Sequence, residues 1–216
     1  MKFDRSKPKR AFTVWELLVV VVLLVMIALL LLPMLARPNR PAHLIQCCNN
    51  LRQVGLAFRQ WSLDHNGQYP MSIPATNGGT KESVLRGGVH LHFQVLSNEL
   101  NTPKVLVCPA DKSRRQAPNF NAGIGESNIS YFVGVDASEA LPNMLLTGDR
   151  YLTNGTMPSN RVCELTTNSV VGWTEETHNM IGNVGLADGN VQSWSTSKLR
   201  EGLANTGVAT NRLAMP

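Results

Sequence analysis

The chain of 216 residues has room for one modest domain beside a membrane segment, and its formal charge is +5. Most of this charge lies in Met1–Ala11, which holds five basic residues and one acid; of the 20 basic and 15 acidic residues in the whole chain, 15 and 14 remain after it. Because the rest of the chain is nearly neutral and has no basic stripe interleaved with aromatic residues, we expect no nucleic-acid partner.

An apolar run follows the basic segment, from Leu17 to Leu35. Its ~19 residues are close to the length that a helix needs to cross a bilayer core, and the basic residues before it predict a cytoplasmic amino terminus. A signal peptide or simple anchor would explain both features. Neither explains Glu16, since a carboxylate in an apolar segment costs about 3 kcal/mol on insertion scales. Pro33 predicts a kink, because proline removes a backbone hydrogen bond.

The segment Arg10-Ala11-Phe12-Thr13-Val14-Trp15-Glu16-Leu17-Leu18-Val19-Val20 resembles the processing signal of type IV prepilins and type II secretion pseudopilins. The resemblance implies that a prepilin peptidase removes a leader of residues 1–11 by cutting between Ala11 and Phe12, and that Phe12 is then methylated. It also implies assembly roles for Glu16, whose charge the Phe12 amine of a neighbouring subunit would meet, and for Pro33, which matches the family's helix-bending proline. Ala11 stands where glycine is usual, and Val14-Trp15 replaces the commoner Leu-Ile.

Apolar residues then recur at spacings of three and four, which predicts one face of an amphipathic helix. The helix is expected to end near Gly67, a residue suited to a carboxy-terminal cap. A transmembrane half over residues 12–36 followed by an exported amphipathic half over residues 37–67 is the plan of the pilin family, in which the second half packs on a sheet. The apolar residues of the predicted face are Leu44, Cys48, Leu51, Val54, Phe58 and Trp61.

Residues 68–216 are predicted to form an exported head domain, so the expected fold class is α+β, with the long amino-terminal helix packed on a small antiparallel sheet. The strongest hairpin signal is Asp188-Gly189, because Asp-Gly is a favoured type I′ pair. A last helix is expected to begin with Ser195 or Thr196 as its cap and to end before Gly207. A short helix is predicted at 90–100, and strands at 105–108, 129–133, 144–146, 170–173, 183–186 and 191–194.

His178, followed after nine residues by Asp188-Gly189, resembles the carboxy-terminal signature of a group of pilin-like proteins with a His-x9-Asp-Gly motif, numerous in planctomycetes and verrucomicrobia. Cys108-Pro109-Ala110-Asp111 and Ser130-Tyr131-Phe132-Val133-Gly134 resemble further segments of that group. We expect Asp188 in a hairpin turn and His178 packed near the strand. His178 and Asp188 could ligate a metal, and some pseudopilins hold calcium; because calcium prefers several oxygen ligands and histidine is a poor one, no cofactor is assigned, and calcium stays the open alternative. Asp111, Asp136 and Asp149 are expected to be solvated loop carboxylates.

The four cysteines, Cys47, Cys48, Cys108 and Cys163, lack the C-x-x-C spacing of a zinc site, and an exported domain permits a disulfide. A bridge from the amphipathic helix to Cys108 would tie the helix to the head domain. The resemblance to the His-x9-Asp-Gly group favours Cys47 as the partner, whereas the helix periodicity favours Cys48, and both remain open. Cys108 with His178 and an acid would suggest a thiol nucleophile, but an exported cysteine is more often bridged, and we expect no enzyme.

These features predict a structural subunit of the inner membrane, with the head domain in the periplasm or outside the cell. The prepilin peptidase would process it, and an inner-membrane platform would assemble it with other pilin-like subunits into a pilus or a type II secretion-like pseudopilus. The alternative is an exported ligand-binding module that uses the pilin-type segment only as a membrane anchor.

Overall fold

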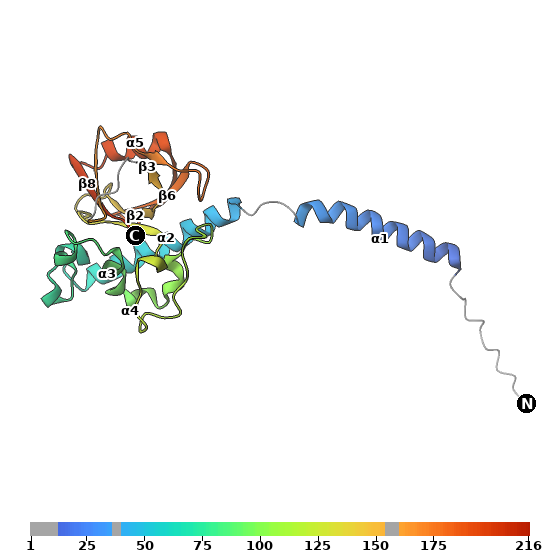
Figure 1. Cartoon of the computed structure of the whole chain (residues 1–216), viewed down its shortest axis with the longest axis horizontal. Coiled ribbons are helices and arrows are strands. Elements are labelled where there is room, and N and C mark those ends of the chain that lie inside the picture. Colours follow the sequence, from blue (N-terminus) through green and yellow to red (C-terminus); the bar gives the residue numbers. More distant parts are fainter. Residues whose placement is uncertain (1–12, 36–39, 154–159) are drawn as a thin grey trace, which may run out of the picture. The chain divides into compact units, whose positions relative to one another are not determined.

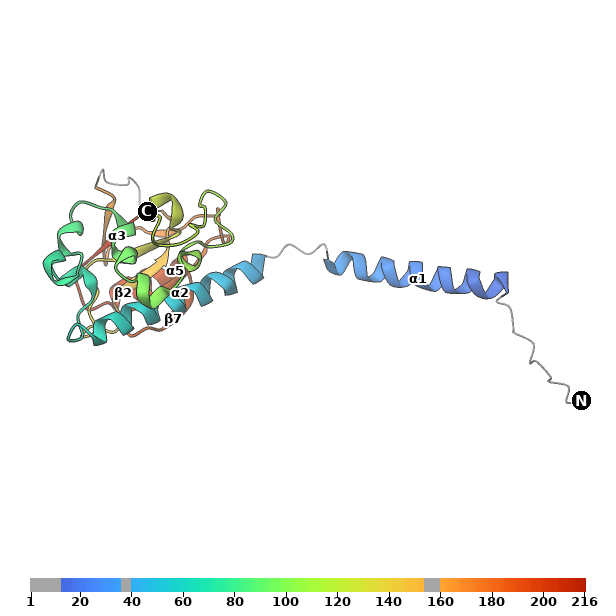
Figure 2. The same ribbon diagram turned by 90° about the horizontal axis from the view of Figure 1, so that it is seen from below.

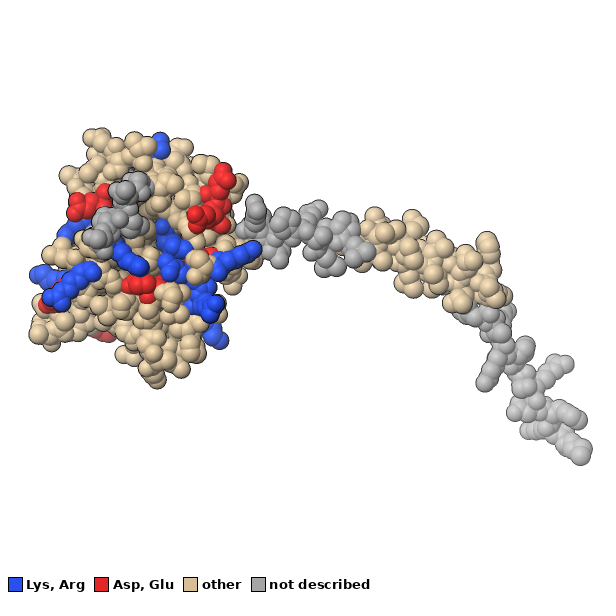
Figure 3. Space-filling view, in the orientation of Figure 1, with Lys and Arg blue, Asp and Glu red and all other residues tan. Residues whose placement is uncertain are grey.

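The computed structural model describes residues 13–35, 40–153 and 160–216, and the chain divides into two units, residues 1–39 and 40–216. The described residues of the first unit, 13–35, form the helix α1 (Val14–Leu35; Figure 1). By length and composition, Val14–Leu31 is able to cross a membrane, and such a helix near the amino terminus fits a membrane anchor or a secretion signal. On the face drawn in Figure 3, the visible part of α1 presents no charged side chain.

The second unit is built on a six-stranded antiparallel sheet with the strand order β4-β8-β1-β2-β6-β7. A two-stranded sheet pairs β3 with β5. The fold class is therefore α+β, as predicted. The strands are β1 (Tyr131–Gly134), β2 (Leu145–Asp149), β3 (Leu152–Thr153), β4 (Val162–Thr166), β5 (Gly172–Trp173), β6 (Ile181–Leu186), β7 (Val191–Ser195) and β8 (Thr210–Ala214).

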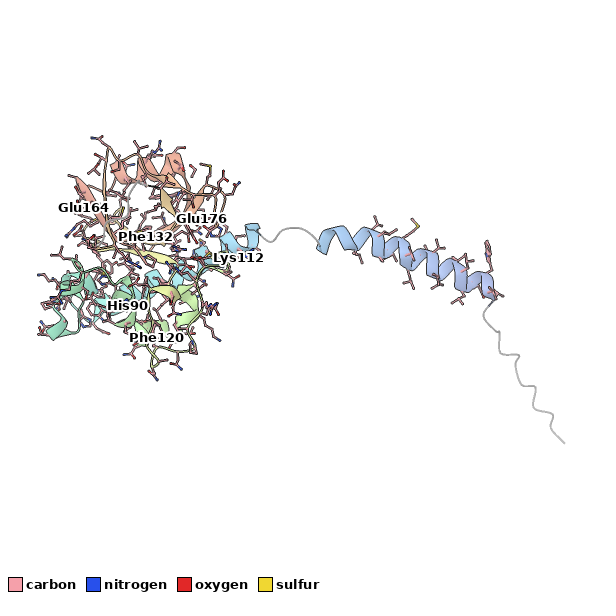
Figure 4. The ribbon with its side chains drawn as sticks, viewed as in Figure 1. His90, Lys112, Phe120, Phe132, Glu164 and Glu176 are labelled. Atoms are coloured by element: carbon pink, nitrogen blue, oxygen red, sulfur yellow. A yellow bond between two sulfur atoms is a disulfide. The ribbon has the colours of Figure 1, made fainter. Side chains whose placement is uncertain are left out.

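Helices cover both faces of the large sheet (Figures 1 and 2). One face carries α2 (Arg40–Leu63), α3 (Val89–Gln94) and α4 (Ser97–Leu100), and the other carries α5 (Thr196–Ala204). Strand β1 illustrates that both faces of the sheet are covered. All four of its residues are buried, although successive side chains point to opposite faces. Tyr131 packs in the core beside α2, whereas Phe132, labelled in Figure 4, packs with Trp194 and Leu199 beneath α5.

The amphipathic pattern of α2 was a good guide to its packing. Leu51, Val54, Phe58 and Trp61 are buried against the sheet, as predicted, whereas Leu44 and Cys48, also assigned to this face, are only half-buried. The chain leaves the helix through Gly67, whose left-handed backbone (φ 74°) lets its N–H donate to the carbonyl of Ser62 at 2.8 Å. Ser195 caps α5 by accepting a hydrogen bond from the Lys198 N–H, as predicted.

Other local predictions were wrong or incomplete. Residues 105–108 do not form a strand; the 3-10 helix η4 (Pro103–Leu106) occupies this stretch, because Thr102 caps it and proline suits its first position. Strands β4 and β8 had not been predicted. The other 3-10 helices are η1 (Pro70–Ser72), η2 (Ala75–Asn77), η3 (Lys81–Ser83) and η5 (Glu126–Asn128).

Candidate functional site

The start of α1 has a specific hydrogen-bonded geometry. Thr13 precedes the helix, and Glu16 Oε2 accepts hydrogen bonds from the Thr13 N–H and hydroxyl, both at 2.9 Å. The Thr13 Oγ1 in turn accepts from the Glu16 N–H at 3.3 Å, which completes a capping box. Glu16 therefore has a local structural role that the sequence signal Thr-x-x-Glu could have revealed. Ala11 and Phe12 lie outside the described residues; Pro33 falls in the last turn of α1, where side chains are not described.

The second candidate site surrounds a disulfide between α2 and the segment after η4. Cys47 and Cys108, 61 residues apart in the sequence, are bonded with a Cα–Cα distance of 5.2 Å. Of the two open choices the structure joins Cys47, which is fully buried, whereas Cys48 is half-buried and outside the bond. Cys163, also outside this bond, is buried on β4.

His178 and Asp149 lie against this disulfide. His178 Nε2 is 3.3 Å from Cys108 Sγ and 3.8 Å from Asp149 Oδ2. His178 comes from the loop before β6 and Asp149 from the end of β2. All four side chains are buried, and one ligating atom from each lies within 4.8 Å of the others. The structure thus brings Cys108, His178 and an acid together, which no spacing in the sequence indicated.

Burial controls the charges in this cluster. It raises the pKa of Asp149 to about 7, although hydrogen bonds to Oδ2 from the Asn183 backbone N–H (2.7 Å) and side-chain amide (3.0 Å) oppose the rise. Burial, followed by the nearby His43, lowers the pKa of His178 to about 4. At neutral pH the imidazole is therefore uncharged and forms no ion pair with Asp149. His178 Nδ1 is buried with no hydrogen-bond partner among the described residues.

The His-x9-Asp-Gly motif does not form one site. Asp188 and Gly189 form the turn between β6 and β7, as predicted for Asp188, and the Asp188 carbonyl accepts a hydrogen bond from Arg59 Nη1 at 2.8 Å. A Cβ on Gly189 (φ 87°) would lie 3.0 Å from Arg59 Cδ. His178 lies near Cys47, and Asp188 binds Arg59. Because these two α2 residues are twelve positions apart, the two ends of the motif meet the helix at points about 18 Å apart along its axis. The motif flanks β6: at one end Asp188 binds Arg59 of α2, and at the other His178 lies against the disulfide that joins Cys47 of α2 to Cys108.

The expectation of solvated loop carboxylates was wrong for Asp111 and Asp149, which are both buried. Asp111 accepts hydrogen bonds from Arg150 Nε at 2.8 Å and from the hydroxyls of Ser113 and Tyr151 at 2.8 and 3.0 Å. Burial raises the pKa of Asp111, but the hydrogen bonds and charge of Arg150 outweigh it, so this pKa lies below its ordinary value. The network fixes the loop that follows Cys108.

A cavity of about 510 Å³ lies elsewhere on the head domain. Its lining includes Tyr69 and Lys81 together with the ion pair between Asp136 and Arg212. This volume falls in the range of small-molecule sites. Comparison with protein-family models, with curated proteins and with solved structures found no match for this chain.

Proposed function

We propose that this chain is a pilin-like structural subunit of the inner membrane, processed between Ala11 and Phe12 and assembled into a pilus or a type II secretion-like pseudopilus. The membrane-length apolar helix α1 and the attachment of α2 to an antiparallel sheet support this proposal. In this proposal the amino terminus is cytoplasmic, and the head domain lies in the periplasm or outside the cell. The partners are the prepilin peptidase, the inner-membrane assembly platform and pilin-like subunits of the same or another kind.

The observation that carries the proposal is a stripe of three exposed apolar side chains on the outer face of α2, interspersed with the exposed polar residues Asn49, Arg52 and Gln60. Ile45, Leu56 and Leu63 are 62%, 65% and 79% exposed. At 100° per residue they fall within about 20° of one another around the helix axis, opposite the buried Val54. Large apolar side chains aligned on the open face of a helix are suited to a partner surface, and the helices of neighbouring subunits would supply it.

Glu16 has two possible roles, and they can be separated. As a capping residue it can be replaced by glutamine, which also accepts the Thr13 hydrogen bonds, whereas alanine removes the cap. As a charge that meets the Phe12 amine of a neighbouring subunit, it can be replaced by neither. Filament yield after shearing, with subunit level in the membrane as the control, should therefore fall in both Glu16→Ala and Glu16→Gln. Normal assembly of Glu16→Gln would assign Glu16 to capping alone.

Processing is tested by the intact mass of the protein from its native membrane. A mature chain that begins at methylated Phe12 is the expected result. A chain that still carries residues 1–11 would contradict the proposal and favour the anchored module.

The alternative function, a membrane-anchored ligand-binding module, is favoured by the cavity beside Arg212 and Lys81. In that case Glu16→Ala would leave function intact, and Lys81→Ala would abolish binding of a polar ligand. A ligand screen by thermal shift with the wild-type chain and Lys81→Ala, with exposed Lys104→Ala as the matched control, distinguishes the two functions.

A further inference from the structure

The cluster at Cys47, Cys108, Asp149 and His178 combines two sulfurs, an imidazole and a carboxylate. This is a ligand set typical of zinc sites. A tetrahedral ion with ligands at about 2.0–2.3 Å places those ligands roughly 3.3–3.8 Å from one another. The distances from His178 Nε2 to Cys108 Sγ and to Asp149 Oδ2, 3.3 and 3.8 Å, lie within about half an ångström of the separations that a tetrahedral ion requires, whereas the two bonded sulfurs would have to move apart.

The surroundings also resemble those of a metal site. Metal ligands are usually oriented by hydrogen bonds from a second layer of residues. Asn183 donates twice to Asp149 Oδ2, the oxygen that faces His178, and Ser193 Oγ donates to Asn183 Oδ1 at 2.6 Å. The carboxylate is thus held in place by a relay from β7 through β6 to β2.

His178 itself has an unusual environment. Its side chain is 1% exposed, yet Nδ1 has no partner in the described part of the chain. A buried polar atom left unpaired costs about 1–3 kcal/mol, but it is the other ring nitrogen, Nε2, that faces Cys108 and Asp149. The next two residues, Asn179 and Met180, adopt left-handed backbone conformations (φ 55° and 62°). For methionine this conformation is unfavourable, so the loop holds the imidazole over the sulfurs at an energetic cost.

We propose that these four residues form a zinc-type metal site in the reduced chain, and that the metal ion and the Cys47–Cys108 disulfide are alternative occupants of the same position. Cys47, Cys108 and His178 Nε2 would be ligands with Asp149 Oδ2 as the fourth. The tautomer of His178 that binds metal carries its proton on Nδ1. The proposal does not depend on filament assembly.

The exchange between the two states balances as follows. A dithiol reductant gives an electron pair and its two thiol protons to the disulfide and leaves as its own disulfide, which produces two thiols at Cys47 and Cys108. The metal ion then replaces these two protons, which pass to water, as the sulfurs separate. A small-molecule disulfide reverses the sequence: it takes the electron pair from the two thiolates and two protons from water, leaves as thiols, and the metal ion is released. Because both cysteines are buried, exchange requires opening of the loop at His178 or entry of the ion before the fold closes.

The test uses the full chain in detergent micelles, prepared anaerobically with a phosphine reductant that becomes its oxide as water supplies the oxygen. Cobalt(II) is the probe, since it reports tetrahedral thiolate coordination through visible ligand-field bands and a near-ultraviolet charge-transfer band. We expect one equivalent to bind, zinc to displace it, and the oxidised chain to show no such bands. Zinc should also protect Cys47 and Cys108 from alkylation, as read by mass spectrometry, while Cys48 stays reactive.

Variants locate the site. Cys108→Ser should abolish the charge-transfer pattern of two thiolates, and His178→Gln or Asp149→Asn should weaken cobalt binding at least about tenfold. Cys48→Ser is the matched control and should bind as the wild type does. Absence of tetrahedral bands in the reduced wild-type chain, whether it is folded or not, overturns the proposal. Bands that survive in the Cys47→Ser/Cys108→Ser chain, or disappear in Cys48→Ser, overturn it as well.

Discussion

The disulfide offers the most quantitative prediction, through the double substitution Cys47→Ser/Cys108→Ser. The bond closes a loop of 61 residues. The chain-entropy relation for a loop of this length gives a stabilisation of about 4 kcal/mol at 25 °C. That is a large share of the 5–15 kcal/mol unfolding free energy that is typical of whole domains, so we expect the variant to fold but with a much smaller free energy of unfolding.

The assay is urea unfolding of the full chain in micelles with a metal chelator present, followed by tryptophan fluorescence. Trp61, Trp173 and Trp194 are all nearly buried, so their emission reports the opening of both cores. Reduced wild type should unfold like the double variant, and the half-buried control Cys48→Ser should stay within about 1 kcal/mol of the oxidised wild type. A loss below 1 kcal/mol in the double variant, or an equal loss in Cys48→Ser, would refute the reasoning.

Three further predictions concern the head domain and α2. Gly189→Ala should destabilise by about 1–2 kcal/mol more than Gly78→Ala, measured by urea unfolding, because both glycines have positive φ but only at Gly189 does a Cβ meet a side chain, that of Arg59; equal losses would show that this contact is unimportant. Burial, followed by the charge of His90, lowers the pKa of His92 to about 4, so the unfolded chain binds more protons between about pH 4 and 6.5 and the stability of the wild type should gain about 1.4 kcal/mol per pH unit from this group as pH rises. His92→Asn should lack this gain in unfolding titrations, and an unchanged slope would contradict it. Leu56→Glu should leave stability within about 0.5 kcal/mol and abolish filament assembly, so wild-type filament yield would count against the proposed packing of the exposed stripe.

Sequence reasoning succeeded where local chemistry decides structure. The spacing of Leu51, Val54 and Phe58 defines the buried face of α2, and Asp188-Gly189 defines a hairpin turn, because both depend on near neighbours in the chain. It failed where partners are distant. Nothing near Asp149 in the sequence indicates that α2, the loop after η4 and the loop before β6 bring their side chains to it.

The choice between Cys47 and Cys48 depends on how periodicity is applied to α2. Cys47 lies four, seven and eleven residues before Leu51, Val54 and Phe58, which is the spacing of one buried helix face, whereas Cys48 is rotated from that face by 100°. The prediction that Cys48 lies nearer the apolar face was therefore wrong. The position of Cys108 was also mispredicted, because this residue follows the 3-10 helix η4 and does not lie in a strand.

The position of the disulfide also has a mechanical consequence. Cys47 is the eighth residue of α2, near the end of the helix that follows the first unit in the sequence. A pull applied through the first unit therefore reaches the head domain through a covalent bond before it reaches the sixteen residues of α2 that follow Cys47. While the bond is intact, it resists separation of α2 from the sheet under tension. When the bond is reduced, the tension acts on the packed turns of α2 one after another, and the helix can detach from the sheet turn by turn.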